Sequence, residues 1–383
     1  MTVNYNVGLG ENHTENSYTF FDCFMFTNSV ALKILMIVGY SVVMATSIVG
    51  NSILVFVYFK NKSMKNTVNC CIMNMVFADL LVTLVYMPRM VARIVGGLEW
   101  LVEGTSGLIL CKFVSISQEV SIGVSILTVV IIAFERFFAV AFPLRVLIPK
   151  KLSMGLLCAT WLVSMGARCP MFYAVKTVHS PSGKLGCFWV HTLSFPTKEA
   201  RKYYHTFMLI TSYGLPLLFI ITLYTSILVF LKRRQGLIGN ATRNRASATN
   251  RKVTQMILAV ITVFLLCWLL YFIAIPLEEF WNVPLSCEVH FLRFFLGHMN
   301  SACNPIICLV FSENYRNGIK RSCFGRLRRW KRRQRHVSRG STLRERSIST
   351  IALLSVKTLE RDSSFQHRKG INDTSFQYEE NGV

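Results

Sequence analysis

The amino-acid sequence predicts an all-α membrane protein: a bundle of seven transmembrane helices with a short amphipathic helix after the last span. Hydrophobic residues make up 52% of the 383 residues, and the mean hydropathy is +0.43. A water-soluble chain of this length cannot cover so much apolar material with polar surface. The apolar residues are also gathered into long runs, and a helix needs about 20 mostly apolar residues to cross a membrane.

The charges between the apolar runs predict the orientation of the chain. The runs are residues 32–59, 68–95, 106–141, 152–173, 204–231, 253–277 and 289–311. The connections after the first, third and fifth runs are basic, with Lys60, Lys62, Lys65, Arg145, Lys150, Lys151, Lys232, Arg233, Arg234, Arg243, Arg245, Arg251 and Lys252. The connections after the second and sixth runs carry Glu99, Glu103, Glu278, Glu279 and Glu288. Basic loops stay in the cytoplasm, so the amino terminus is expected outside. The long connection after the fourth run is also basic, but long loops follow this rule weakly.

The two ends of the chain are expected to lie on opposite sides of the membrane. We predict an extracellular tail over residues 1–31, the bundle over 32–311, the amphipathic helix over 312–324 and a disordered cytoplasmic tail over 325–383. Asn12 begins the glycosylation sequon Asn-His-Thr in the extracellular tail. Cys323 could carry a palmitoyl chain. The basic cluster over residues 326–335 would attract anionic lipid head groups.

Other classes of protein fit the sequence less well. The net charge of +23 is typical of nucleic-acid binding, but the basic residues lie between apolar runs and in the carboxyl-terminal tail. No metal-spacing histidine cluster, nucleophile elbow or phosphate-binding loop stands out, so we expect neither an enzyme nor a resident cofactor. A channel or transporter is the main rival, although no internal repeat is evident.

Several ionisable or amide side chains interrupt the apolar runs. Such groups are costly in a membrane, and each either forms a hydrogen bond between helices or has a function. They are Asp79 in the second run, Gln118, Glu119, Glu135 and Arg136 in the third, and His298 in the seventh. A carboxylate at the position of Asp79 must be protonated, paired or bound to a cation.

The cysteines divide by compartment. Cys111 begins the third run on the outer side and Cys187 lies in the loop after the fourth, so both face an oxidising space and are expected to form a disulfide. Cys23 and Cys287 are also expected outside and predict a second bridge. Most others, such as Cys267, lie within runs and are expected to be packing residues.

Each of the seven runs also contains a short motif. The motifs, in order, are Gly50-Asn51, Ala78-Asp79-Leu80-Leu81, Glu135-Arg136-Phe137, Trp161, Pro216 with Tyr224, Cys267-Trp268 and Asn304-Pro305. Taken together, they resemble the rhodopsin-like family of G protein-coupled receptors over residues 39–324. Two positions depart from the family pattern: Leu270 stands where span six usually has a proline, and Cys308 where span seven usually has a tyrosine. These departures concern the energetics of activation rather than the fold.

The resemblance implies roles for residues in the inner part of the bundle. Asp79, Ser125, Asn300 and Asn304 would hold a sodium ion in the inactive state, for which oxygen ligands around a carboxylate are suitable. Ile126, Pro216 and Phe264 look like the packing switch of the family. The G protein side would involve Glu135, Arg136, Leu144, Tyr224, Asn304 and Pro305. Arrestin and a receptor kinase are the further expected partners, through serines and threonines of the tail.

The resemblance also narrows the ligand. Gln118 aligns with the acid that anchors amines, and His298 aligns with the lysine that holds retinal, so neither ligand is favoured. Gln118 together with Glu278 and Glu279 is similar to receptors for amidated peptides of the neuropeptide Y and RFamide groups. A side-chain amide both donates to and accepts from a carboxamide. The expected pocket contains Gln118, Glu119, His205, Trp268, Glu278, Glu279, Arg293 and His298. A receptor for an amine or lipid ligand remains the alternative.

Overall fold

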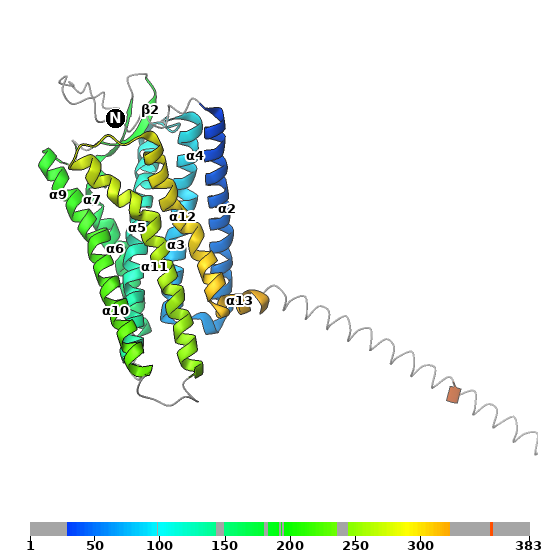
Figure 1. Cartoon of the computed structure of the whole chain (residues 1–383). Helices are drawn as coiled ribbons and strands as arrows, with labels where there is room; N and C mark the ends of the chain where they lie inside the picture. The colour runs from blue at the N-terminus through cyan, green and yellow to red at the C-terminus, as the bar shows by residue number, and fades with distance from the viewer. Residues whose placement is uncertain are drawn as a thin grey trace, which may run out of the picture. The chain divides into compact units, whose positions relative to one another are not determined.

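A computed structural model of the chain describes residues 29–97, 99–142, 149–179, 183–190, 193, 195–235, 244–321 and 353–354. Residues up to Ile319 belong to one compact unit, which contains every element discussed below. The long helices of this unit run side by side as a bundle (Figure 1).

The helices follow the predicted runs closely. The first span is α2 (Val30–Lys60), and a 3-10 turn (Lys62–Met64) follows it. The second consists of α3 (Thr67–Leu81), a π-helical turn η2 (Val82–Tyr86) and α4 (Met87–Gly96). The third is α5 (Gly104–Ala141), and the fourth is α6 (Lys150–Ala167) followed by α7 (Cys169–Ala174). The fifth consists of α9 (Lys198–Leu209), a π-helical turn η3 (Ile210–Gly214) and α10 (Leu215–Gln235). The sixth and seventh are α11 (Asn244–Glu279) and α12 (Cys287–Phe311).

Local sequence explains where several of these helices begin. The side chains of Ser29, Asn66 and Thr197 accept backbone N–H groups at the starts of α2, α3 and α9. Such caps satisfy donors that the first helical turn leaves free. The fourth span differs from the prediction, because its continuous helix ends at Ala167 and the chain turns at Arg168 before α7 begins.

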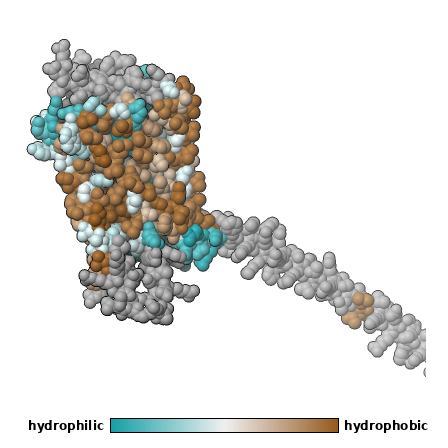
Figure 2. Space-filling model, in the orientation of Figure 1, coloured by the Kyte–Doolittle hydropathy of each residue, from teal (hydrophilic) through white to brown (hydrophobic). Residues whose placement is uncertain are grey.

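Hydropathy is arranged for a lipid environment. Among the described residues, six helical spans are long and apolar enough to cross a membrane, and the shorter apolar helix Lys151–Ala167 lies in the fourth position. Large apolar side chains such as Leu162, Leu218 and Leu266 are at least 60% exposed. Hydrophobic residues cover the visible flank of the bundle (Figure 2). Polar side chains including Asn51 and Asp79 are buried instead, as expected where lipid surrounds the bundle.

A β-hairpin joins the outer ends of the helices. Strands β1 (Val175–His179) and β2 (Leu185–Trp189) pair antiparallel. The predicted disulfide between Cys111 of α5 and Cys187 of β2 is present, with Cα atoms 5.7 Å apart. Cys287 is also disulfide-bonded, while Cys23 lies outside the described residues, so the identity of the second bridge stays a prediction.

The short helix α13 (Glu313–Ile319) follows α12 at the inner end, within the predicted range 312–324. Its Tyr315 is fully buried. Gly318 lies against α2 so closely that an added Cβ would come within 2.4 Å of Val57 Cγ1. A glycine is therefore needed for this close approach.

Candidate functional site

A buried ion pair lies in the outer half of the bundle. Glu119 of α5 is 9% exposed, and its Oε2 atom lies 3.2 Å from the guanidinium of Arg168. The phenol of Tyr271 on α11 donates a 2.8 Å hydrogen bond to Glu119 Oε1. The hydroxyl of Tyr204 on α9 donates to the carbonyl of Ala167. The Glu119 carboxylate therefore connects spans three, four and six, and the Tyr204 hydrogen bond attaches span five to the end of α6.

Sequence reasoning named Glu119 but missed Arg168. The arginine lies inside the apolar run 152–173, where an ionisable side chain is itself a functional signal. A buried carboxylate requires a partner, and an arginine in the neighbouring span was the available candidate.

Two further acids end α11, and both are paired within the protein. The Glu278 carboxylate lies 2.6 Å from Arg293 Nη1 and 3.1 Å from His290 Nε2, both on α12. Glu279 Oε2 lies 2.9 Å from Arg201 Nε on α9. The structure thus brings the predicted residues Glu278, Glu279 and Arg293 to the outer mouth of the bundle.

The predicted His205 joins the Glu279 pair, with Nε2 3.7 Å from Glu279 Oε1. Arg201 and His290 were not predicted, because their partners lie far away in the sequence.

The floor of the outer half contains polar atoms that lack partners. Gln118 is 2% exposed, and its side-chain carbonyl oxygen has no hydrogen-bond partner among the described residues. The same holds for the indole nitrogen of Trp268, which is 4% exposed. His298 is 1% exposed and its Nδ1 atom lies 3.1 Å from the hydroxyl of Tyr40. Buried polar atoms are almost always satisfied, so these groups mark where a ligand or water would bind.

Below the floor, apolar side chains form a compact cluster. Ile122 and Ile126 of α5 pack with Phe264, Trp268 and Phe272 of α11. Pro216 of α10 is buried as well. An added Cβ on Gly297 would lie 2.7 Å from the Trp268 ring, so only glycine lets the indole pack flat against α12. Helix α11 continues through Leu270 and contains Pro276 in its outer part.

Asp79 lies in the middle of the bundle among oxygen-bearing side chains. Asn304 Nδ2 donates a 2.8 Å hydrogen bond to Asp79 Oδ2, and the Ser301 side chain also bonds to this carboxylate. Ser125, Asn300 and Asn304 are all buried. The side-chain oxygens of Asn300 and Asn304 are buried without hydrogen-bond partners among the described residues. A carboxylate beside unsatisfied oxygens suits a hard cation such as sodium.

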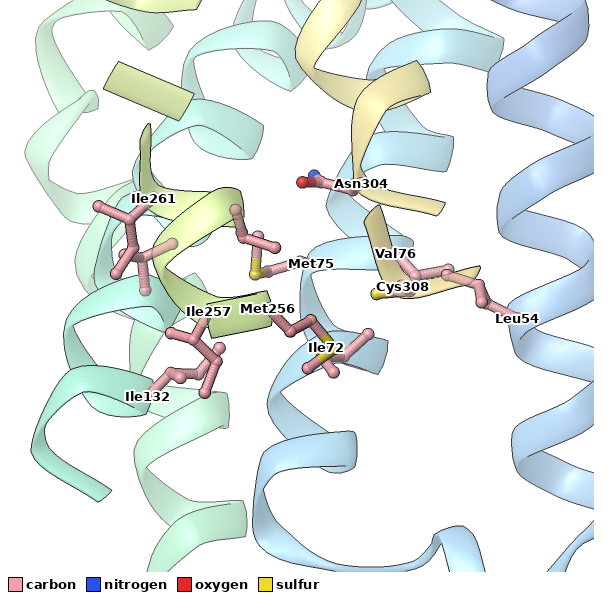
Figure 3. Close-up of a pocket in the computed structure, with 12 residues that line it drawn as sticks. Leu54, Ile72, Met75, Val76, Ile132, Met256, Ile257, Ile261, Asn304 and Cys308 are labelled. Carbon is pink, nitrogen blue, oxygen red and sulfur yellow. The ribbon is translucent and has the colours of Figure 1, made fainter. Parts of the chain in front are cut away.

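The inner half of the bundle is closed by apolar contacts. A cavity of about 20 Å³, the volume of roughly one water, lies between α2, α3, α5, α11 and α12 (Figure 3). Its lining residues are Leu54, Ile72, Met75, Val76, Val129, Ile132, Met256, Ile257, Val260, Ile261, Asn304 and Cys308. Arg136 is ion-paired with the adjacent Glu135. The hydroxyl of Tyr224 is buried without a hydrogen-bond partner in the described structure.

Cys308, which departs from the family motif of span seven, lies at the inner cavity. Cys308 is 2% exposed and lines the closed cavity, where a smaller thiol replaces the expected phenol. Pro305 of the same motif is buried in α12. Cys267 was predicted to be a packing residue, but its thiol also hydrogen-bonds to that of Cys303 on α12. The predicted residues Asn12, Cys23, Leu144 and Cys323 lie outside the described residues.

Comparison with known proteins agrees with this geometry. The sequence pattern of the 7 transmembrane receptor (rhodopsin family) matches residues 50–307. The chain therefore belongs to the rhodopsin family of seven-transmembrane receptors. It is a multi-pass protein of the plasma membrane and a receptor rather than an enzyme.

Curated relatives cover most of the chain. A QRFP-like peptide receptor of Branchiostoma floridae is 26% identical over 308 residues, which are 76% of this chain and 78% of the relative. The neuropeptide Y receptor type 1 of Xenopus laevis is 30% identical, over 74% of this chain and 78% of its own length. The galanin receptor type 1 of Rattus norvegicus is 29% identical, over 74% and 80%.

Proposed function

We propose that the chain is a receptor for a small amidated neuropeptide and activates heterotrimeric G proteins. The relatives named above are receptors for QRFP-like peptide, neuropeptide Y and galanin. The observation that carries the proposal is Gln118, whose buried carbonyl oxygen has no partner among the described residues. A carboxamide at the end of a peptide offers an N–H to that oxygen and a carbonyl to the Gln118 N–H groups. A free carboxylate could accept from the Gln118 N–H groups but has no N–H to donate to the Gln118 oxygen.

A basic residue of the peptide would bind at Glu279. Glu279 Oε2 and Arg201 Nε lie 2.9 Å apart, yet neither atom forms a hydrogen bond in the described structure. A peptide guanidinium that bonds to both carboxylate oxygens would be a better partner than Arg201. Glu278 is less available, because Arg293 donates a 2.6 Å hydrogen bond to it.

Activation would couple this pocket to the inner half. An agonist shifts the equilibrium only through its higher affinity for the active packing. Trp268 belongs both to the floor of the pocket and to the cluster with Ile126 and Phe264, so a ligand on the floor can displace α11. Outward movement of α11 would separate Met256 and Ile257 from Ile72 and Ile132, open the closed cavity and expose Arg136 to the G protein.

Further partners follow from the same proposal. Sodium at Asp79, Ser125, Asn300 and Asn304 would stabilise the closed packing, in which Asn304 and Asp79 lie together, because a bound ion favours the state that keeps its ligands in place. Phosphates added by a receptor kinase in the tail would create negative charge for arrestin. Anionic lipids would meet the basic residues 326–335. Leu144 would contact the G protein, and Cys323 would anchor the tail by palmitoylation.

The test is a screen of amidated peptides against the purified receptor, read by nucleotide exchange on several G proteins. Each active peptide is compared with its free-acid form on the wild type, Q118L and the control S117A, which changes a hydroxyl that bonds to its own helix. We expect the amide to be more potent by at least about ten-fold, as for one lost hydrogen bond to a buried group. Q118L should abolish this preference and S117A should keep it.

Two outcomes would contradict the proposal. One is a preference for the amide that Q118L leaves intact. The other is activation by amines or lipids but by no peptide. Ligand flux across the membrane without nucleotide exchange would instead favour a transporter.

A further inference from the structure

The outer end of the second span carries two arginines, one helical turn apart on α4. Arg89 is 8% exposed and already occupied. Its Nη1 atom donates a 2.9 Å hydrogen bond to the carbonyl of Glu99. Its guanidinium also lies over the Trp100 ring, 4.9 Å from the centroid. Arg89 is therefore held by structural contacts.

Arg93 differs from Arg89. Its side chain is half-buried, and its guanidinium has neither a hydrogen bond nor an ion pair with an acid among the described residues. Arg93 interacts electrostatically with the phenols of Tyr40 and Tyr86. Tyr40 is fully buried between spans one and seven, where it contacts Phe291 and Phe295. Arg93 itself is half-buried, and a partly buried cation is less stable without an anion than with one.

The surroundings of Tyr86 carry an excess of positive charge. Its phenol interacts with Arg93, Arg89 and Arg293 but with a single acid, Glu119. That acid is engaged by Arg168, and Arg293 is engaged by Glu278. The charge of Arg93 therefore has no counter-charge among the described residues around it.

We infer that Arg93, at the outer end of α4, binds an anionic group of the agonist, a carboxylate or sulfate. The inference rests on the proposed function, and it adds an acidic side chain to the expected amidated peptide. A guanidinium offers two parallel N–H groups that match a carboxylate or sulfate. Tyr40 and Tyr86 are themselves buried, and attraction between charges is stronger in partly apolar surroundings than in water. The amide would occupy Gln118 while the acid occupies Arg93.

The first experiment does not require a known agonist. The full-length receptor in neutral-lipid nanodiscs is heated with N-acetylglutamate, N-acetyl-O-sulfotyrosine or N-acetylglutamine. The variants are R93Q and the control K198Q, which removes a charge from an exposed side chain at the same outer face. We expect both anions to raise the melting temperature of the wild type and K198Q above the effect of N-acetylglutamine. R93Q should lose this difference. Equal shifts for anions and amide, or an anion effect that survives in R93Q, would overturn the inference.

The second experiment uses peptides active in the screen above. Each is synthesised with Glu, Gln or Lys at every non-terminal position in turn. At one position, Glu should be at least ten-fold more potent than Gln on the wild type and K198Q but equal to it on R93Q. The charge reversal R93E should favour Lys there. An agonist that activates both receptors with no such position would overturn the inference and leave the proposed function standing. Anion binding in the first experiment, with no active peptide in the screen, would overturn the proposed function and leave the anion site standing.

Discussion

The outer and inner halves of the bundle are built from the same helices but differ in how their charged side chains are paired. The outer half joins acids and bases from different spans, as in Glu119 with Arg168 and Glu278 with Arg293. In the described inner half, Arg136 pairs with its own neighbour Glu135, and the helices meet in a large apolar cluster with a few hydrogen bonds between neutral groups, such as Asn74 with Thr128. Polar contacts in the outer half are directional and can select a ligand. Apolar contacts in the inner half can separate and close again without leaving buried charges unpaired.

The largest effect is expected from breaking the central ion pair of the outer half. In R168M, the carboxylate of Glu119 keeps only the hydrogen bond from Tyr271. A buried charge without its partner costs about 3–5 kcal/mol, so R168M should show a strongly lowered melting temperature and little receptor at the cell surface. The double variant E119Q/R168M should recover much of this loss, because it removes both charges.

The matched control is K184Q, which breaks the exposed pair between Lys184 and Glu99, 3.0 Å apart. An exposed pair contributes about 0–1 kcal/mol, so this variant should melt like the wild type. A double variant no more stable than R168M would show that the Glu119 network does not depend on charge pairing.

A smaller effect is expected where the two halves meet. In G297A, the new methyl group would lie 2.7 Å from the Trp268 ring. Overpacking of this kind costs about 1–3 kcal/mol and should displace the indole from its position above Phe264. We expect G297A to change basal nucleotide exchange as well as stability. The control G166A adds a methyl group where nothing lies within 4 Å. Equal basal activity in G297A and wild type would argue against Trp268 as the connection.

The smallest effect concerns the polar core between the halves. In D79N, the charge that would hold sodium is removed while the contact with Asn304 can be kept. Agonist affinity of the wild type should fall when choline is replaced by sodium, by up to about ten-fold, in the range of known couplings between sites. The affinity of D79N should be the same in both salts. Equal agonist affinity of the wild type in sodium and in choline would contradict the proposed sodium site at Asp79.

The sequence predicted the positions of the helices better than it predicted which charged side chains pair with each other. Apolar runs of suitable length and basic loops located the helices, because lipid imposes the same requirement on every span. The disulfide between Cys111 and Cys187 was predicted because both cysteines were expected on the oxidising, extracellular side. The ion pairs were harder, since Arg168 and Arg201 are far in sequence from Glu119 and Glu279. Nothing in one sequence shows which helices face each other, so the pairing of each acid could not be predicted even where both residues were visible.

Glu278 and Glu279 illustrate this limit. They were predicted together as an outer acidic site for a basic ligand group. In the structure each already has a cation, Arg293 for one and Arg201 for the other. The sequence therefore placed the two acids at the outer end of span six but did not reveal that each is paired, so that a ligand would have to compete for it.

Coupling between the two halves requires that a ligand in the outer half opens the inner half. The direct measurement is the distance between spin labels that replace the exposed Lys65, just before α3, and the exposed Gln255, in the inner part of α11, in the reconstituted receptor. An active peptide together with G protein should lengthen this distance, and Q118L should prevent the change. An unchanged distance while the same peptide stimulates nucleotide exchange would contradict the account.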